Sequence, residues 1–441
     1  MRPVATLGSP GSAPTTAQDH ETRPPRPEEV RELTALKVTL VEFSPSGGLF
    51  QFAVQLGEAL AGRGHDVELL TGPRPELTSR HPGFRIVPCL PTWHASEGAG
   101  DPRLRRRVRR VARAARYHLA WVVLLRRLAR TRPDVVQFSG GRFPVDGVAT
   151  AWLARRRRGG RPALVTLAHS PLPFNEQRAT GEVLRSNRLL HASFGLGYRS
   201  VDALIVLGEQ SAADLRQAWP DVDDVTVVPH GDEGVFLSDA PVPADQTPPQ
   251  VLFFGTLQAY KGLDVLLDAF ALVREQVPDA RLLIAGAPSG DTDLDALRST
   301  ADRIGGVELR AGYVPMADVP ALFQQSRVVA APYRYANASG VVELARTSSR
   351  PAVGTTVGDL PAVIADGETG LLVPPGDPRA FATALVRLLT DPAEARRMGE
   401  AARARSTEGA SWATVAERTE EVLRRALATR GPGTGTGVVE P

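Results

Sequence analysis

The sequence predicts a two-domain α/β protein in which each domain has a parallel β-sheet covered by helices on both faces. The chain has 441 residues, which is too many for one ordinary hydrophobic core and suits two domains with tails. Short apolar runs of strand length alternate with segments of helical length along most of the chain. This alternation stops at a proline-rich break near 236–250 and then restarts.

The first domain is expected over 34–235. Its first strand (37–43) leads into the loop SPSGGL, after which a helix runs from about residue 50 to residue 63. The other strands are mostly apolar runs, which is typical of parallel sheets buried on both faces. These further strands are expected at 66–72, 84–90, 134–140, 163–170, 203–208 and 225–231.

The break at 236–250 is expected to be a linker, and the second domain should cover 251–410. Strands are expected at 251–255, 281–287, 307–314 and 327–333, with helices at 263–275, 378–391 and 393–405. A last helix is expected within 411–428. The ends of the chain, 1–33 and 429–441, are rich in Pro, Gly and polar residues without apolar periodicity, so we expect disordered tails.

Composition excludes several classes of protein. The longest apolar run, LAWVVLL at 119–125, is far shorter than the roughly 20 residues that a membrane-spanning helix needs. Residues 1–33 contain no apolar stretch of the kind found in secretory signals. The single cysteine, Cys89, excludes an internal disulfide and a cysteine-based metal cluster. We therefore expect a cytoplasmic protein with no resident metal.

The stretch VVAAPYRYANASGVVEL at 328–344 predicts a buried strand, a loop and a helix that begins at Ser339. Free N–H groups around Gly340 and Val341 would form an anion site at the positive end of the helix dipole. Glu343 lies one turn further on. An ordinary helix start with an acid in its first turn accounts for the same letters, so this stretch alone leaves both interpretations open.

A second stretch, VLFFGTLQAYKG at 251–262, favours the anion site. It predicts a strand, a glycine turn and then Lys261 before a helix. Lys37 and Lys261 are the two lysines among 52 basic residues of the chain, and a lysine kept in so arginine-rich a sequence suggests a need for a compact ammonium group. With these motifs the sequence resembles the family-4 retaining glycosyltransferases, whose two Rossmann-like domains form the GT-B fold.

The resemblance implies a fold and an activity. Two Rossmann-like domains would face each other across a cleft, and the C-terminal helix would cross back onto the first domain. The enzyme would move a hexose from a nucleoside-diphosphate-sugar to a glycan, a lipid-linked sugar or a small molecule, without a metal or another cofactor, in polysaccharide or glycoconjugate biosynthesis. The nucleotide base, the sugar and the acceptor stay open.

The resemblance also assigns roles to residues. Lys261 would meet the donor's β-phosphate, together with the N–H groups near Ser339, and His169 in LAHS would face the transferred sugar; these two are the expected catalytic residues. Glu343 would hold the ribose diol, and Tyr313–Pro315 would meet the base. His230 is expected to be structural. The full expected donor-binding set is Gly47, Gly48, Gly255, Thr256, Gln258, Lys261, Tyr313, Val314, Ser339, Gly340, Val341 and Glu343.

Four positions depart from the family pattern. Tyr335 stands where the first acid of the Glu-x7-Glu motif belongs, and Thr256 stands where an arginine often accompanies the lysine. In VGDLPAV, Asp359 replaces a usual glycine and Ala362 a usual acid. Two alternatives therefore stay open: another GT-B enzyme, such as a nucleotide-sugar epimerase or a phosphorylase, and a non-catalytic GT-B partner protein.

The segment Arg103–Arg132 combines many arginines with an apolar stripe. The stripe residues recur every three or four positions and so share one helical face: Leu104, Val108, Val111, Ala115, Leu119, Val122 and Leu125. Arg155–Arg158 adds another basic cluster. Such a segment could rest on an anionic membrane surface at the inner face of the membrane, or it could be an ordinary amphipathic helix. No recognition motif for nucleic acid accompanies it.

Overall fold

The computed structural model describes residues 35–97, 103–156, 162–172, 188–234, 242–289, 292–336, 339–409 and 411–429. The expected tails at 1–33 and 429–441 lie outside the described residues, apart from Thr429. The expected linker lies outside them from 236 to 241, and the basic cluster lies outside them at 157–158. From Leu36 onward the chain forms one unit.

The first sheet has seven parallel strands in the order β3-β2-β1-β4-β5-β6-β7. In register, Leu40 of β1 pairs with Leu69 of β2 and with Gln137 of β4. Nearly all residues of the central strands are buried, as expected for a sheet covered on both faces. Its strands are β1 Lys37–Val41, β2 Asp66–Leu70, β3 Phe84–Val87, β4 Val135–Phe138, β5 Ala163–Leu167, β6 Ala203–Val206 and β7 Val225–Val227.

Alternate residues of these strands pack against different helices. Leu40 belongs to a core formed with α2 and α14, whereas Val41 belongs to a core formed with α3. This follows from the period of two along a strand. The helices that follow the strands of this sheet are α2 Gly48–Gly62, α3 Arg103–Thr131, α4 Pro144–Arg156, α5 Arg188–Tyr198 and α6 Glu209–Ala218.

The second sheet has six parallel strands in the order β10-β9-β8-β11-β12-β13. The strands are β8 Gln250–Phe254, β9 Arg281–Gly286, β10 Val307–Ala311, β11 Val328–Ala331, β12 Ala352–Thr355 and β13 Gly370–Val373. The sequence did not predict β12 and β13. Each has four residues, and each lies among prolines and glycines. So short a run carries little pattern of its own, and pairing with β11 and with each other supplies the order.

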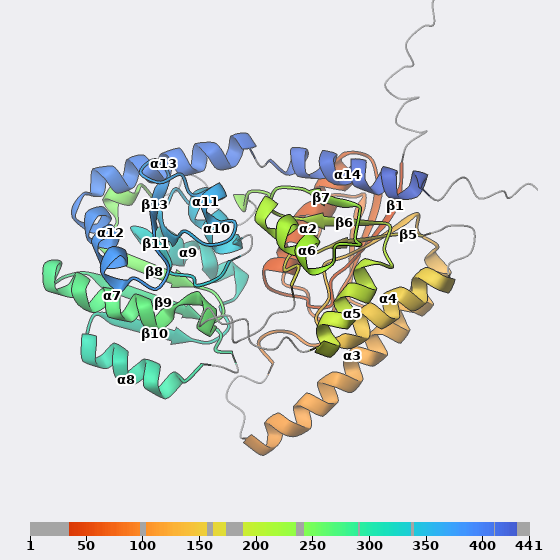
Figure 1. Ribbon diagram of the computed structural model, residues 1–441, viewed down its shortest axis with the longest axis horizontal. Coiled ribbons are helices and arrows are strands. Elements are labelled where there is room, and N and C mark those ends of the chain that lie inside the picture. Colours follow the sequence, from red (N-terminus) through yellow and green to blue (C-terminus); the bar gives the residue numbers. More distant parts are fainter. Residues whose placement is uncertain are drawn as a thin grey trace, which may run out of the picture. The chain divides into compact units, whose positions relative to one another are not determined.

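Helices also cover the second sheet. One large apolar core includes residues of α7, α10 and α12, and α9 packs on a smaller core at Leu252 and Val329. The predicted α/β architecture with two parallel sheets is confirmed (Figure 1). The helical elements are η3 Ala244–Gln246, η4 Ala259–Lys261, α7 Leu263–Gln276, α8 Leu294–Ile304, η5 Met316–Asp318, α9 Val319–Gln324, α10 Gly340–Thr347, α11 Leu360–Val363, α12 Pro378–Thr390 and α13 Pro392–Gly409.

The last helix, α14 (Trp412–Ala428), packs on the first sheet although it follows the second in the sequence. It contacts α2, β5 and β6, and Val415 and Leu423 are fully buried there (Figure 1). At its start, the Trp412 indole N–H donates to the Asp232 carbonyl oxygen at 2.6 Å. The expected return of the C-terminal helix to the first domain is confirmed.

Ion pairs made by Glu420 hold α14 against the end of α2. The Glu420 carboxylate accepts from Arg63, the residue that follows α2, at 2.6 Å and from Arg424, one turn further along α14, at 2.7 Å. Burial disfavours the ionised carboxylate, but the hydrogen bonds from Arg63 and Arg424 outweigh it and lower the pKa of Glu420 to about 2. Glu420 therefore links α14 to the end of α2.

We predict that Glu420→Gln weakens the folded state near neutral pH. Because the folded pKa lies below the unfolded value, the carboxylate stabilises the fold above about pH 4, by about 2–3 kcal/mol. This contribution is lost as the pH falls through about 2. Urea unfolding at several pH values should show the two proteins converging as the solution is acidified. The exposed neighbour Glu417→Gln is the matched control, and an equal loss of stability there would contradict the assignment.

Candidate active site

The turn from β8 to α7 buries a lysine. After Phe254 the chain turns through Gly255 at φ 110° and reaches Lys261, the last residue of η4. A Cβ atom on Gly255 would lie 2.6 Å from the Lys261 Nζ atom, so a side chain at this position would displace the ammonium. Gly262, at φ 67°, has no room for a Cβ beside the Pro332 carbonyl oxygen either. Gly255 thus leaves the space in which the ammonium lies, and Gly262 lets the turn pass close to Pro332.

Lys261 has no counter-ion within the described part of the chain. Its side chain is 8% exposed, and no described carboxylate lies within ion-pair distance of it. Burial lowers the pKa of Lys261 to about 8. The Tyr333 ring lies 5.5 Å from Nζ, at cation–π distance. A buried cation without a negative partner is costly, so the turn favours the arrival of an anion.

The start of α10 lies beside this ammonium. The position of a Cβ on Gly255 is 2.6 Å from Lys261 Nζ and 3.6 Å from Val341 Cγ2, so the two side chains are close neighbours. Ser339 caps the helix, its Oγ accepting from the Val342 N–H at 3.4 Å. The N–H groups of Gly340 and Val341 have no partner among the described residues. The structure therefore brings together the lysine and the helix terminus that the sequence singled out.

Two histidines continue this cluster. His169 follows β5, and its ring lies 6.5 Å from that of His230. The His230 Nε2 atom is 3.8 Å from the position of a Cβ on Gly340, so both rings lie near the start of α10. Burial, aided by the charge of His230, lowers the pKa of His169 to about 4. His169 is therefore neutral at neutral pH and can both donate and accept a hydrogen bond.

Glu343 points into the protein instead of standing free. It is 2% exposed, and both of its oxygens accept from Arg346 Nη1 at 2.8 Å. Burial nevertheless raises the pKa of this carboxyl, with the charge of Arg346 acting in the opposite direction. Nearby Glu233, which the sequence did not single out, accepts from Gln55 at 2.9 Å, and its pKa is raised to about 8, mainly by burial. The pattern of the sequence carries no signal for the Gln55–Glu233 pair, because these residues come from segments 178 positions apart.

The glycine pair of the first domain lies at the start of α2. Gly47 has φ 85°, and neither it nor Gly48 has an atom within 4 Å of the place where a Cβ would be. Tyr313 reaches this loop from the second domain, with its hydroxyl hydrogen-bonding to the Gly47 backbone and donating to Glu76 at 2.6 Å. Val314, the next residue, is partly buried on the core of its own domain.

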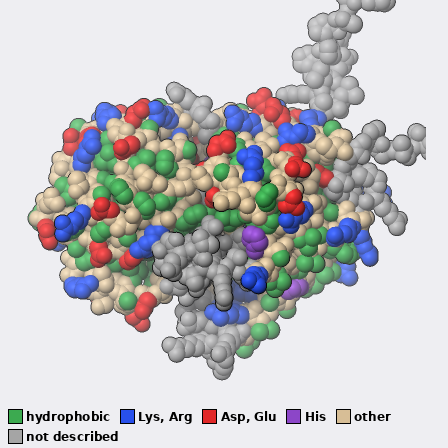
Figure 2. Space-filling model, viewed as in Figure 1, with side chains coloured by type: hydrophobic (Ala, Val, Ile, Leu, Met, Phe, Trp, Pro, Cys, Tyr) green, Lys and Arg blue, Asp and Glu red, His purple; other side chains and the backbone are tan. Residues whose placement is uncertain are grey.

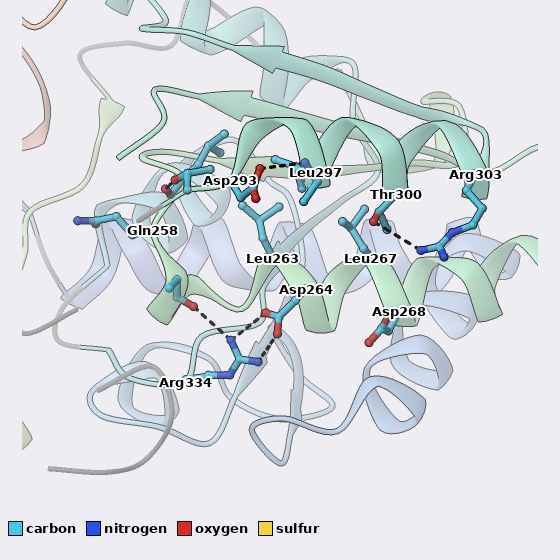
Figure 3. A pocket seen from close by; sticks show the side chains of 14 residues that line it. Gln258, Leu263, Asp264, Leu267, Asp268, Asp293, Leu297, Thr300, Arg303 and Arg334 are labelled. Carbon is cyan, nitrogen blue, oxygen red and sulfur yellow. Dashed lines mark hydrogen bonds and ion pairs between the residues drawn. The ribbon is translucent and has the colours of Figure 1, made fainter. Parts of the chain in front are cut away.

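Thr256 and Gln258 do not belong to the buried part of the cluster around Lys261. Thr256 is exposed in the turn after Gly255. Gln258 lines a groove of about 370 Å³ between α7 and α8 (Figure 3). Arg334 and Asp264 form an ion pair at this groove. The structure thus groups Gly255, Lys261, Ser339, Gly340, Val341 and His169, and it groups Gly47, Gly48 and Tyr313 separately.

Two departures from the family pattern both contact α6. Asp359, which replaces a glycine, accepts from the Gln210 N–H at 3.0 Å and from the Ser211 hydroxyl at 2.7 Å. Gly208, which precedes α6, has no side chain to cap that helix, so Asp359 provides the cap from the second domain. Tyr335, which replaces an acid, donates to Asp214 on the same helix at 3.3 Å.

We predict that Asp359→Ala loosens the first turn of α6. Removing the cap should cost about 1–2 kcal/mol of stability, since it leaves backbone N–H groups of α6 without a partner. Hydrogen–deuterium exchange of the peptide covering 209–212 should become faster. The control is Asp377→Ala, because Asp377 caps α12 within its own domain at 3.0 Å. Unchanged exchange in α6 of Asp359→Ala would show that the cap is not needed.

Comparison with known proteins places these features in a family. Residues 248–391 match the family described as glycosyl transferases group 1, and residues 46–231 match the family described as glycosyltransferase family 4. D-inositol 3-phosphate glycosyltransferase of Streptomyces avermitilis is 27% identical over 409 residues, which cover 87% of this chain and 84% of that protein. Other curated relatives match more strongly over a shorter stretch, at 36% and 32% identity, and there the chain spans 44% and 59% of their length.

Solved structures share the fold. Sucrose-phosphate synthase from Thermosynechococcus elongatus superimposes with a TM-score of 0.69 at 21% identity, over 89% of this chain and 99% of that one. Anabaena HepE, solved in complex with UDP-glucose, has a TM-score of 0.63 at 15% identity, over 88% of this chain and 99% of that one. With two parallel sheets, the returning C-terminal helix and both family matches, the chain belongs to the family-4 retaining glycosyltransferases of the GT-B fold.

Proposed function

We propose that this protein transfers a hexose from a nucleoside-diphosphate-sugar to a hydroxyl group of a phosphorylated polyol, with retention of the anomeric configuration. The family supports the class of reaction. The name of the Streptomyces avermitilis relative supports an inositol phosphate as the acceptor. Lys261 carries the proposal, because a buried ammonium without a described counter-ion lies beside the free N–H groups at the start of α10.

The donor's diphosphate would occupy this position. Its β-phosphate would lie against Lys261, and its oxygens would accept from the N–H groups of Gly340 and Val341. In the transfer, the bond between the sugar C1 and the β-phosphate oxygen breaks while a bond to the acceptor oxygen forms on the same face. The acceptor proton passes to the leaving phosphate. Positive charge fixed beforehand stabilises the negative charge that develops on that phosphate.

His169 would position the sugar. A neutral imidazole offers one donor and one acceptor, which suits a sugar hydroxyl. At a pKa of about 4 it is neutral through the physiological range, so it can hydrogen-bond to the sugar without adding a second positive charge beside Lys261. We propose further that no divalent metal takes part, because the ammonium and the helix terminus supply the charge that a metal would otherwise bring.

The function is tested by incubating the full chain with UDP-, GDP-, ADP- and TDP-linked hexoses and with D-inositol 3-phosphate, and by following release of the nucleoside diphosphate. We expect one donor to be turned over with the acceptor present, and the rate to be unchanged by a chelator. Hydrolysis or epimerisation of the donor alone would support a different GT-B enzyme. Tight nucleotide binding without turnover on any acceptor would contradict an enzymatic role.

Lys261→Ala should lower kcat/KM by about 100- to 1000-fold, the effect of losing one preorganised group that stabilises developing charge. The other lysine, Lys37, is exposed at the start of β1, so Lys37→Ala is a matched control and should keep full activity. Lys261→Ala should also weaken binding of the free nucleoside diphosphate, measured by calorimetry. Near-normal turnover in Lys261→Ala would show that Lys261 has no role in the reaction.

Affinity for the nucleoside diphosphate should fall at alkaline pH. The cationic form of Lys261 binds the anion, and its pKa in the free protein is about 8. Between pH 7 and pH 9 the cationic fraction falls about tenfold, so the affinity should fall by about the same factor. Titrations across this range should show the loss in the native protein and a much smaller one in Lys261→Ala. If both proteins lost affinity equally between pH 7 and pH 9, a group other than Lys261 would be the cause of the loss.

A further inference from the structure

Helix α3 has two apolar stripes, of which one is buried. Tyr117, Trp121, Leu124 and Leu128 pack on the first sheet. Of the stripe that the sequence singled out, Leu125 packs partly against this core, whereas Val108, Val111, Leu119 and Val122 are exposed on another side of the helix. Because the helix already has a core-facing side, this second stripe is not needed for folding.

The neighbouring helices expose apolar side chains as well. Val148 and Trp152 of α4 and Leu189 of α5 are all exposed. The cores of α3, α4 and α5 lie on the same side of the first sheet, so the outer sides of these helices form one surface, named here the α3–α5 face. In the described part of the chain, Val242 is the one strongly exposed large apolar residue outside 108–189.

The charge of the α3–α5 face has one sign. The helices contain a single carboxylate, Asp146, which is buried and accepts from the Trp121 indole N–H at 2.8 Å. Exposed arginines stand around the apolar residues at Arg110, Arg126, Arg130, Arg156 and Arg188. In Figure 2, hydrophobic and basic side chains are mixed over the region where Figure 1 shows α3, α4 and α5.

We propose that the α3–α5 face binds the surface of a bilayer rich in anionic phospholipids. The arginines would pair with lipid phosphates, while the valines, leucines and Trp152 would enter the boundary between headgroups and acyl chains. Arg156 lies 4.7 Å from the Trp152 ring, an arrangement in which an amphipathic pair can meet both layers. None of the described helices has the length and apolar character needed to cross a bilayer, so the contact would be interfacial.

Other partners fit this surface less well. A nucleic acid would pair with the arginines but would leave the exposed valines and leucines in water, since its backbone offers them no apolar contact. A second copy of the chain would bring arginines against arginines with no exposed carboxylate on the helices to pair with them. A bilayer matches the charge and the apolar side chains together.

The test uses the full chain with vesicles of phosphatidylcholine alone, or of phosphatidylcholine mixed with phosphatidylglycerol, and measures binding by flotation. No donor or acceptor is added, so the outcome is independent of the proposed transfer activity. We expect binding to the anionic vesicles only, and weaker binding at high salt. Binding to both vesicles alike, or to neither, would overturn the proposal.

Variants locate the contact. Val111, 72% exposed, and Leu119 can be replaced by Glu with little effect on the fold, and each change should lower partitioning about tenfold or more. Arg126→Ala and Arg130→Ala should lower it about fivefold each. Val242→Glu and Arg298→Ala change exposed residues outside the α3–α5 face; they are the matched controls and should bind as the native chain does. Equal loss in variants and controls would overturn the assignment. So would duplex DNA binding or dimer formation that Val111→Glu abolishes while vesicle binding persists.

Discussion

The candidate site depends on one electrostatic constraint, a buried ammonium group held beside the amino end of a helix. Lys261 lies in a turn where Gly255 leaves room for its ammonium, and no described carboxylate offsets its charge. The second positive feature, the free N–H groups of Gly340 and Val341, comes from a different strand–helix connection. Folding therefore places a full positive charge beside the partial positive charge of a helix terminus, which costs stability until an anion arrives. The rest of the second domain can be understood as the support for this arrangement.

The order of the parallel strands holds Lys261 and the start of α10 next to each other. β8 and β11 are neighbours in the second sheet, so the turns that follow them open at the same edge, where ligands bind in open α/β sheets. Buried strand residues on both faces fix the register of these turns. The first domain contributes through the turn that follows β5 and through His230, and α14 fixes His230's segment by the bond from Trp412 to Asp232. Residues far apart in the sequence thus meet within a few ångströms.

Much of this could be predicted from the sequence, because the strands that carry the site have strong apolar patterns. The segments around Lys261 and Ser339 each combine a clear strand with turn residues and a helix start, and the structure brings them together. The sequence could not show that Gln55 donates to the buried Glu233, because the two residues are 178 positions apart. It also could not show that Asp359 and Tyr335 contact α6, since contacts between domains have no period along the chain. The strands β12 and β13 were not predicted because each has four residues, too few to show a pattern, and is ordered by pairing with its neighbouring strands.

The contact between Asp359 and α6 has a consequence for the rate of product departure. Its hydrogen bonds exist while the two domains lie together, so any opening that frees a nucleotide must first give the Gln210 N–H and the Ser211 hydroxyl to water. A contact worth about 1 kcal/mol changes the ratio of open to closed molecules about fivefold. A glycine at this position would have no side chain to make these bonds. In this chain, the residence time of the spent nucleotide would be set partly by a carboxylate that touches neither substrate.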